Sequence, residues 1–283
     1  SRGLGDVYKR QVLVHIYFIP MVYAVLLGYL LTDILRNRKI VRPLVSFLAI
    51  TVSSLCTMFL IGGFYGAQGV QAPGLGKYSA NYNALWNPFQ YSHFLKAFHT
   101  NKGQSEGFGY LGLGVILAGM ILLVLLFSFL EKRIHNWHDC KKWVTAWYPV
   151  VIPVCVVMII SAFMAASPVG TLNAKILYTI PYPEKIMEIL SIFRASGRFI
   201  WIDHYIITIA VFAGIAKLNQ KKTVIFMTAF CLCLQLLDFR DFFVERHQLF
   251  TESKTYQFAL DDGAYEELSL IHISEPTRLQ LIS

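Results

Sequence analysis

The sequence predicts an all-α fold: a polytopic membrane helix bundle of about six transmembrane helices, with two longer outer loops and an interfacial helix. Hydrophobic residues make up 55% of the chain and charged residues only 15%, whereas soluble domains carry about 25% charged residues. Apolar stretches recur at close to the roughly 20 residues that cross a bilayer. Because lipid offers the backbone no hydrogen-bond partners, spans of this length must be helical, since barrel strands are about half as long.

The apolar stretches define the bundle and its limits. They cover residues 12–35, 43–62, 109–130, 147–166, 199–217 and 222–237. We therefore assign 12–237 to the transmembrane bundle. The segment 238–267 is expected to be the truncated start of an extracytoplasmic segment or domain.

Basic residues gather in the short connections between the predicted spans. They are Arg36, Arg38, Lys39 and Arg42, then Lys132, Arg133, Lys141 and Lys142, then Lys217, Lys221 and Lys222. Short loops rich in Lys and Arg face the cytoplasm. A multi-pass protein of the cell membrane is expected, with residues 63–108, 167–198 and 238–267 extracytoplasmic. Span-end topology explains these charges, so membrane lipids and no nucleic acid are the predicted partners.

The two ends of the chain can be encoded by complementary DNA strands. Residues 1–11 read SRGLGDVYKRQ, and with one choice of codons their reverse complement translates as LSLIHISEPTR, the sequence of residues 268–278. The corresponding DNA resembles a transposase sequencing adaptor. We therefore expect 1–11 and 268–283 to be adaptor sequence, and the stretch between them to be a fragment of a longer protein.

The cysteines do not follow the spacing of a disulfide or zinc framework. Four of them lie inside predicted spans and one in a cytoplasmic loop: Cys56, Cys155, Cys231 and Cys233, and Cys140. Cys231 and Cys233 are two residues apart and would point to different sides of a helix. No cofactor and no metal site is identified from the sequence.

The first outer loop contains the segment NALWNPF at residues 83–89. Trp and Tyr favour the membrane interface, and Asn with Pro favours turns, so interfacial anchoring is one interpretation. The other is contact with a sugar or headgroup through Asn87, because amide groups and aromatic faces suit neutral hydroxylated ligands.

Glu106 stands directly before the glycine-rich run GFGYLGLG at residues 107–114. A carboxylate near a helix N-terminus is stabilised by the helix dipole, and ligand or metal binding is the alternative. The glycines follow no strand and lead into an apolar span, so they do not indicate a nucleotide-phosphate loop. Close packing of helices through small residues is the prediction.

The second outer loop predicts an interfacial helix followed by a charged segment. Pro183 can begin a helix, and apolar residues recur on one face of residues 184–193. Arg194 and Arg198 follow, and the next apolar span holds Asp203 and His204 in its first turns.

Two arginines on the outer side oppose the positive-inside bias and require an explanation. If the segment is helical, the four-residue spacing aims Arg194 and Arg198 at one phosphate. Asp203 is an ionisable group inside a span and therefore a functional candidate. The alternative is an internal salt bridge of Arg198 with Asp203 or Glu106 that only joins helices.

Four segments together resemble an uncharacterised family of large bacterial polytopic membrane proteins that is itself similar to GT-C class glycosyltransferases. They are HIYFIPM at 15–21, NALWNPF at 83–89, GQSEGFGYLGLG at 103–114 and FRASGRFIW at 193–201. The resemblance implies transfer of sugar from a polyprenyl-phosphate donor outside the cytoplasm, and a pocket lined by Arg194, Arg198, Glu106 and Asn87. GT-C enzymes carry a catalytic acidic residue in their first outer loop. No residue here matches it, so the chain corresponds to the later half of such a bundle.

Two other function classes fit the same features. A transporter or flippase of lipid or polysaccharide also places paired charges near the outer face, but it usually has internal repeats and broken helices. A non-enzymatic scaffold that displays an outer domain is the third, with YQFALDD at 256–262 as the start of a strand. An acidic first outer loop upstream in the uncut gene would favour the transferase.

Overall fold

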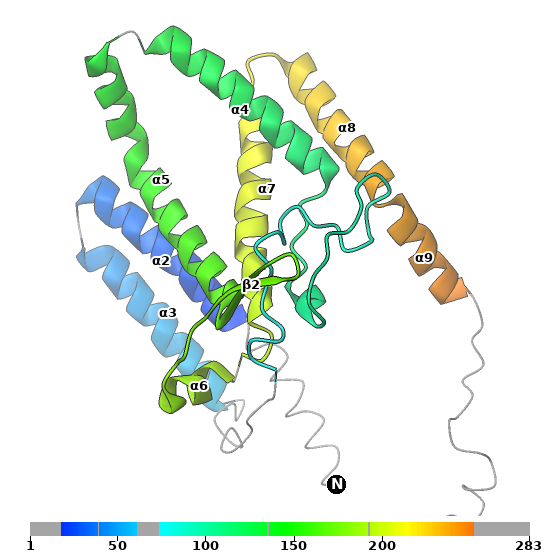
Figure 1. Cartoon of the computed structure of the whole chain (residues 1–283). Helices are drawn as coiled ribbons and strands as arrows, with labels where there is room; N and C mark the ends of the chain where they lie inside the picture. The colour runs from blue at the N-terminus through cyan, green and yellow to red at the C-terminus, as the bar shows by residue number, and fades with distance from the viewer. Residues whose placement is uncertain (1–17, 39, 61–73, 135, 192, 252–283) are drawn as a thin grey trace, which may run out of the picture. The chain divides into compact units, whose positions relative to one another are not determined.

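The computed structural model describes residues 18–38, 40–60, 74–134, 136–191 and 193–251, which are mostly helical (Figure 1). The chain divides into two compact units, Ser1–Phe242 and Phe243–Ser283. The segments 1–11 and 268–283, assigned to adaptor sequence, lie outside the described residues. So does 252–267, which includes the predicted strand.

Each of the six predicted apolar stretches contributes a helix to the described part of the chain. The long helices are α2 (Phe18–Asn37), α3 (Val41–Leu60), α4 (Leu113–Arg133), α5 (Trp137–Ala166), α7 (Ile200–Ala216) and α8 (Lys221–Asp238). The shorter elements are η1 (Gln104–Gly107), β1 (Val169–Leu172), β2 (Lys175–Thr179), α6 (Glu184–Ser191), η2 (Ser196–Phe199) and α9 (Arg240–Thr251). The all-α class is thus supported. The number of these helices that can cross a membrane follows from their length and hydropathy.

Within the described residues, three helical segments are long and apolar enough to cross a membrane: Leu113–Lys132, Trp137–Ala166 and Ser196–Ala216. A fourth results if α8 and α9 form one broken span. Large apolar side chains on these helices are exposed, such as Phe127 at 70% and Ile159 at 68%. Exposed apolar surface of this kind marks contact with a membrane or a partner. The helices therefore support a membrane protein with three or four spans, and six spans remain a prediction.

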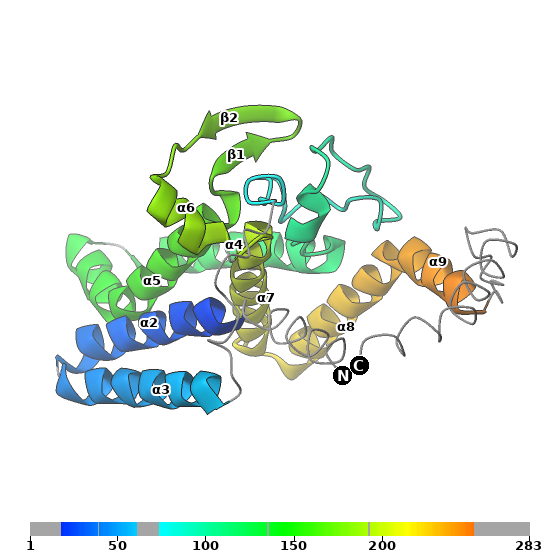
Figure 2. The same ribbon diagram turned by 90° about the horizontal axis from the view of Figure 1, so that it is seen from below.

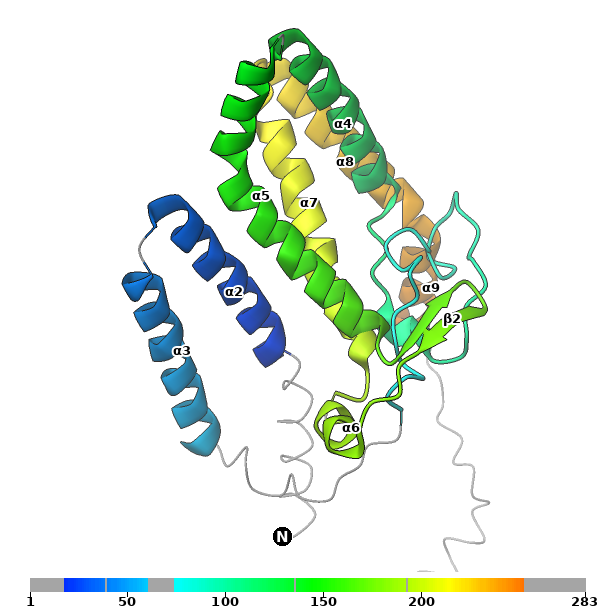
Figure 3. The same cartoon turned by 60° about the vertical axis from the view of Figure 1, so that its left-hand side comes forward.

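Helix α7 contacts α4, α5 and α8, whereas α2 packs on α5 and α3 packs on α2 (Figures 2 and 3). A glycine permits the close approach of α2 to α5. A Cβ atom on Gly28 would lie 2.9 Å from Cγ2 of Val157. Small residues at helix contacts let backbones approach in this way.

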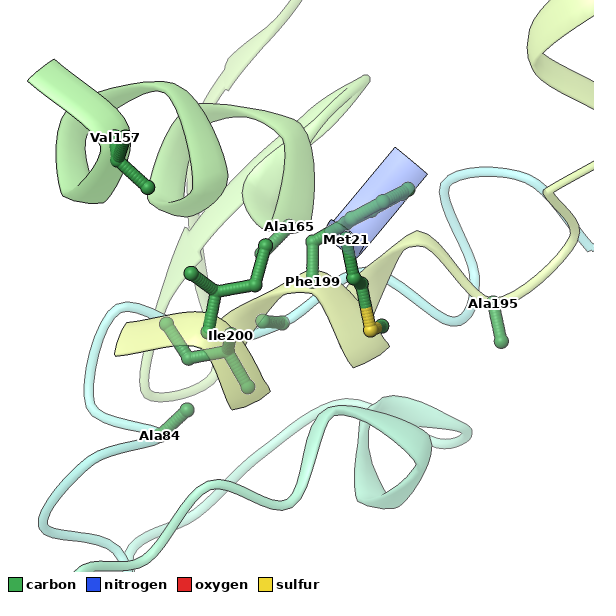
Figure 4. Packing of buried hydrophobic residues seen from close by; sticks show 9 residues of the cluster. Met21, Ala84, Val157, Ala165, Ala195, Phe199 and Ile200 are labelled. Atoms are coloured by element: carbon green, nitrogen blue, oxygen red, sulfur yellow. The ribbon is translucent and has the colours of Figure 1, made fainter. Parts of the chain in front are cut away.

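Two buried apolar clusters hold the helices together. One joins the start of α2, the end of α5 and the start of α7 through Met21, Ala165, Phe199 and Ile200, with Ala84 from the first long loop (Figure 4). The other lies between α4, α7 and α8 and contains Val115, Ala118, Val211, Ile215, Met227 and Cys231. The first cluster ties the loops to the bundle, because it includes loop residues.

The starts of α2, α4 and α7 lie at the same end of the bundle as the ends of α5 and α8, so the long loops share that end. The starts of α2 and α7 meet the end of α5 in the first cluster, and the start of α4 is hydrogen-bonded to the end of α8. The three basic connections, at 37–41, 133–137 and 216–221, must then lie at the opposite end. The orientation prediction requires this arrangement, and the assignment of the basic end to the cytoplasm stays a prediction.

The loop between α5 and α7 contains a β-hairpin that the sequence does not predict. Strands β1 and β2 are antiparallel, with Val169 opposite Thr179 and a register irregularity after Gly170. Asn173 turns the chain between them with φ 55°. The predicted helix after Pro183 is confirmed as α6; its position at the interface stays a prediction.

Candidate functional site

A buried network of side-chain amides joins the first long loop, before α4, to the hairpin. Asn81 Nδ2 donates to Gln104 Oε1 at 3.0 Å and to the Asn173 carbonyl oxygen at 2.7 Å. Gln104 Nε2 donates to Thr171 Oγ1 at 2.6 Å, and Asn83 Nδ2 donates to Asn173 Oδ1 at 2.8 Å. Asn81, Asn83, Gln104 and Thr171 are at most 2% exposed. Buried amides whose bonds are satisfied specify one arrangement, so these two segments form one cap.

Asn87, a predicted ligand-binding residue, is buried inside this cap. Its Oδ1 accepts from the backbone N–H groups of Phe89 and Phe98. Its Nδ2 donates to Asn83 Oδ1 and to the Phe98 carbonyl oxygen. Its exposure is 0%, so its contacts shape the loop, and it is not among the residues that line the pocket described below.

Asp238, at the end of α8, secures the start of α4. Its Oδ2 accepts from the Tyr110 hydroxyl at 2.8 Å and from the Leu113 N–H at 3.0 Å, while its Oδ1 accepts from the Ser92 hydroxyl. Burial, and then the hydrogen bond to Asp238, raise the pKa of Tyr110. The carboxylate thereby satisfies one of the backbone N–H groups that every helix N-terminus leaves unpaired.

Gln235 completes the same junction one helical turn earlier. Its Oε1 accepts from the N–H groups of Gly114 at 3.1 Å and Val115 at 3.4 Å, and its Nε2 donates to the Leu111 carbonyl oxygen at 3.1 Å. A Cβ on Gly114 would lie 2.2 Å from the Cys231 carbonyl oxygen. The predicted role of the glycine run in close helix packing is confirmed at Gly114, where α4 meets α8, and the start of α4 is capped by another helix.

Glu106 and Arg198 form an ion pair where η1 packs on η2. Arg198 Nη2 lies 2.6 Å and Nε 3.2 Å from Glu106 Oε2. The two short helices can approach closely because both carry a glycine at the contact. A Cβ atom on Gly107 would lie 3.2 Å from the Cα of Gly197. The Gly197 N–H also donates to the Tyr78 carbonyl oxygen at 2.9 Å. Of the two predicted partners of Arg198, Glu106 is the one found here.

Residues 194–199 do not continue α6 as an α-helix, so the helical spacing predicted to aim Arg194 and Arg198 at one phosphate is not formed. The Arg194 guanidinium lies over the Tyr78 ring, 4.7 Å from its centroid. Such a cation–π contact contributes about 0.5–1 kcal/mol at an exposed site. The structure brings Arg198 and Glu106 together, and Arg194 contacts a different side chain.

Asp203 lies inside the bundle between α7 and α5. It is 2% exposed, and Ser161 Oγ is 3.0 Å from each carboxylate oxygen. The hydroxyl also lies 2.9 Å from the Val157 carbonyl oxygen. Asp203 therefore joins α7 to α5 through Ser161, and it is not among the residues that line the neighbouring pocket.

A pocket of about 520 Å³ opens beside the Glu106–Arg198 pair, at the starts of α4 and α7. Its lining includes Tyr91, Glu106, Tyr110, Arg198, Trp201, His204 and Tyr205. Two of these side chains are anchored on the backbone that leads into α4. Trp201 Nε1 donates to the Phe108 carbonyl oxygen at 2.9 Å, and His204 Nδ1 lies 3.0 Å from the Gly109 carbonyl oxygen.

Sequence reasoning found the charged pair of this pocket and missed its aromatic wall. Trp201, His204 and Tyr205 share one stretch, at the start of an apolar span where polar side chains are costly. That cost is the signal that could have identified His204. Among the described residues, no three His, Cys, Asp or Glu side chains are grouped to hold a metal ion.

Comparison with known proteins gives a match to a protein family. No curated protein and no solved structure matches the chain. A family model with the description "Domain of unknown function (DUF6311)" matches residues 10–240, which include the whole predicted bundle 12–237. The chain therefore belongs to the DUF6311 family.

Proposed function

We propose that the chain is the membrane part of a glycosyltransferase of the GT-C type, and that the pocket beside Glu106 and Arg198 binds a polyprenyl-phosphate-linked sugar outside the cytoplasm. One observation carries the proposal. An arginine–carboxylate pair and an aromatic wall line one pocket at the end of apolar helices that carries the long loops. A lipid-linked sugar needs a cationic group for its phosphate, aromatic faces for its sugar and apolar surface for its lipid chain, all next to one another.

Arg198 suits the phosphate of such a ligand. A guanidinium group presents several N–H donors in one plane, and this geometry matches phosphate oxygens. Glu106 holds the group in place through Nε and Nη2. The side chain of Arg198 is 28% exposed, so an incoming anion can reach it without displacing the fold.

The aromatic wall suits the sugar. Trp201, Tyr91 and Tyr205 line the same pocket, and aromatic rings offer a large apolar face with a polar edge. The resemblance to GT-C enzymes assigns catalysis to an acidic residue in an outer loop that no position of this chain matches. The residues described here therefore bind and orient the donor.

Comparison of Arg198→Lys with Arg194→Lys tests the proposal. Both substitutions keep the positive charge and remove the planar donor set, but only Arg198 lines the pocket. Binding of a polyprenyl-phosphate analogue to the purified chain is measured in detergent at fixed salt. Arg198→Lys should weaken binding by about 1.5–3 kcal/mol, roughly ten- to hundredfold, and Arg194→Lys should bind like the wild type.

Thermal unfolding of both variants in the same detergent shows that any loss is not a loss of fold. Wild-type affinity in Arg198→Lys would leave Arg198 with a structural role and remove the support for a lipid-phosphate site.

A further inference from the structure

The hydrogen bond of His204 to Gly109 determines which ring nitrogen carries the proton. The Gly109 carbonyl oxygen can only accept, so Nδ1, at 3.0 Å, is the N–H donor. In the neutral imidazole, Nε2 on the other edge of the ring is then a hydrogen-bond acceptor. Backbone bonding of one ring nitrogen in this way fixes the chemical role of the other.

The pocket around His204 has paired charges. Glu106 compensates Arg198, and the Tyr110 hydroxyl donates to Asp238 outside the pocket lining. The His204 ring also meets the Tyr205 ring edge to face, with centroids 5.5 Å apart. An acceptor nitrogen beside an aromatic ring can take a hydrogen bond from the hydroxyl group of a sugar, whereas an ionised phosphate has no proton to donate to it.

We propose that His204 Nε2 accepts a hydrogen bond from a sugar hydroxyl, which makes His204 the residue that selects the glycosylated lipid over the bare polyprenyl phosphate. The inference rests on the proposed function for the lipid-linked nature of the ligand. It adds a second recognition element, since Arg198 binds the phosphate and His204 binds the sugar. The assignment follows from the fixed tautomer and from the place of both residues in one pocket.

Two substitutions separate the two edges of the imidazole. In His204→Asn, the side-chain amide can still donate to the Gly109 carbonyl oxygen, but nothing replaces Nε2. In His204→Gln, the longer amide can place its oxygen where Nε2 stands. The first variant therefore keeps the structural bond and loses the acceptor, and the second restores an acceptor.

Binding of two probes measures the effect: polyprenyl-phosphate glucose and sugar-free polyprenyl phosphate of the same chain length. The detergent must have no sugar headgroup, because a glycoside detergent would compete. Wild type should prefer the glycosylated lipid, and His204→Asn should lose roughly two- to tenfold of that preference, as expected for one hydrogen bond. His204→Gln should recover part of this preference. Arg198→Lys should weaken the binding of both lipids.

A preference in His204→Asn equal to that of wild type overturns the inference, and so does a wild type that binds both phosphate lipids with equal affinity. A third probe, an alkyl glucoside without phosphate, separates the two proposals. If wild type binds the alkyl glucoside through His204 but neither phosphate lipid, the lipid-phosphate function fails and the sugar contact stands. Binding of none of the three probes overturns both.

Discussion

Asp238 and Glu106 are acidic side chains at the same end of the bundle with different surroundings. Asp238 is fully buried and accepts from two hydroxyl groups and a backbone N–H. Glu106 is 37% exposed and pairs with Arg198 beside the pocket. A buried carboxylate with satisfied bonds serves the fold, whereas an accessible pair can exchange partners with a ligand.

Replacement of Asp238 by Asn should destabilise the protein by about 2–3 kcal/mol, since a charged acceptor is lost and an N–H group of the new amide faces other donors. Asp241→Asn is the matched control, because its bond to His93 is exposed and such pairs contribute less than about 1 kcal/mol. Thermal unfolding in detergent compares the two. Equal effects would contradict the structural role of Asp238.

Tyr178 gives a prediction for alkaline pH. Burial, and then the 2.6 Å bond to Tyr82, raise its pKa to about 12. The fold favours the neutral phenol, so this stabilisation is complete below pH 10 and is lost as the pH rises through 12. Tyr82→Phe should lower the pKa, yet leave it above 10 because burial is the larger cause. A pH titration of the ¹³Cζ resonance of Tyr178, assigned with Tyr178→Phe, measures it.

The sequence predicts the charged half of the candidate site and not its partners. Arg198 stands out because an arginine in a loop predicted to lie outside opposes the positive-inside bias. Glu106 stands out because it directly precedes the glycine-rich run 107–114. Their pairing over 92 residues depends on the packing of η1 on η2, for which the sequence gives only the glycines. Asn87 is a ligand candidate in the sequence because amide groups suit neutral hydroxylated ligands, but this amide is buried and its hydrogen bonds lie within the loop.

At the scale of elements, the junction of α4 with α8 depends on the absence of a side chain. Gly114→Ala would place its Cβ 2.2 Å from a backbone oxygen of α8, which cannot move as a side chain can. The loss should be at least about 1–3 kcal/mol. Gly119→Ala is the control on the same helix, where the nearest atom is a Val211 methyl carbon at 3.3 Å.

Size-exclusion profiles and unfolding temperatures of the two glycine variants check this prediction. Similar stability of both variants would mean that α8 can withdraw from α4 without loss.

Long apolar stretches predict helices well and short strands poorly. Every predicted span contains a helix in the described residues, because backbone bonding in an apolar stretch of this length leaves few alternatives. The hairpin consists of strands of 4 and 5 residues. Such segments carry too little alternation to be recognised, and the bonds that hold β1 come partly from Asn81 and Gln104, far away in the sequence.

At the scale of the whole molecule, the basic connections and the long loops lie at opposite ends of the bundle, and cysteine labelling can test whether they face opposite sides of a membrane. Asn37, Asn219 and Lys102 are exposed positions in two basic connections and the first long loop. Single cysteines at these positions, in a Cys-free background that still folds, should react with an impermeant maleimide from opposite sides. Labelling of Lys102→Cys from outside, and of the other two only after permeabilisation, is expected. Labelling of all three from one side would contradict the arrangement.

The cap of α4 by Gln235 and Asp238 also constrains the order of biogenesis. Three backbone N–H groups of α4 find their acceptors in a helix that is synthesised more than 100 residues later. Until α8 packs against α4, these groups need water as a hydrogen-bond partner, because a lipid environment offers none. The start of α4 thus has its full set of these hydrogen bonds only once Gln235 and Asp238 have been synthesised.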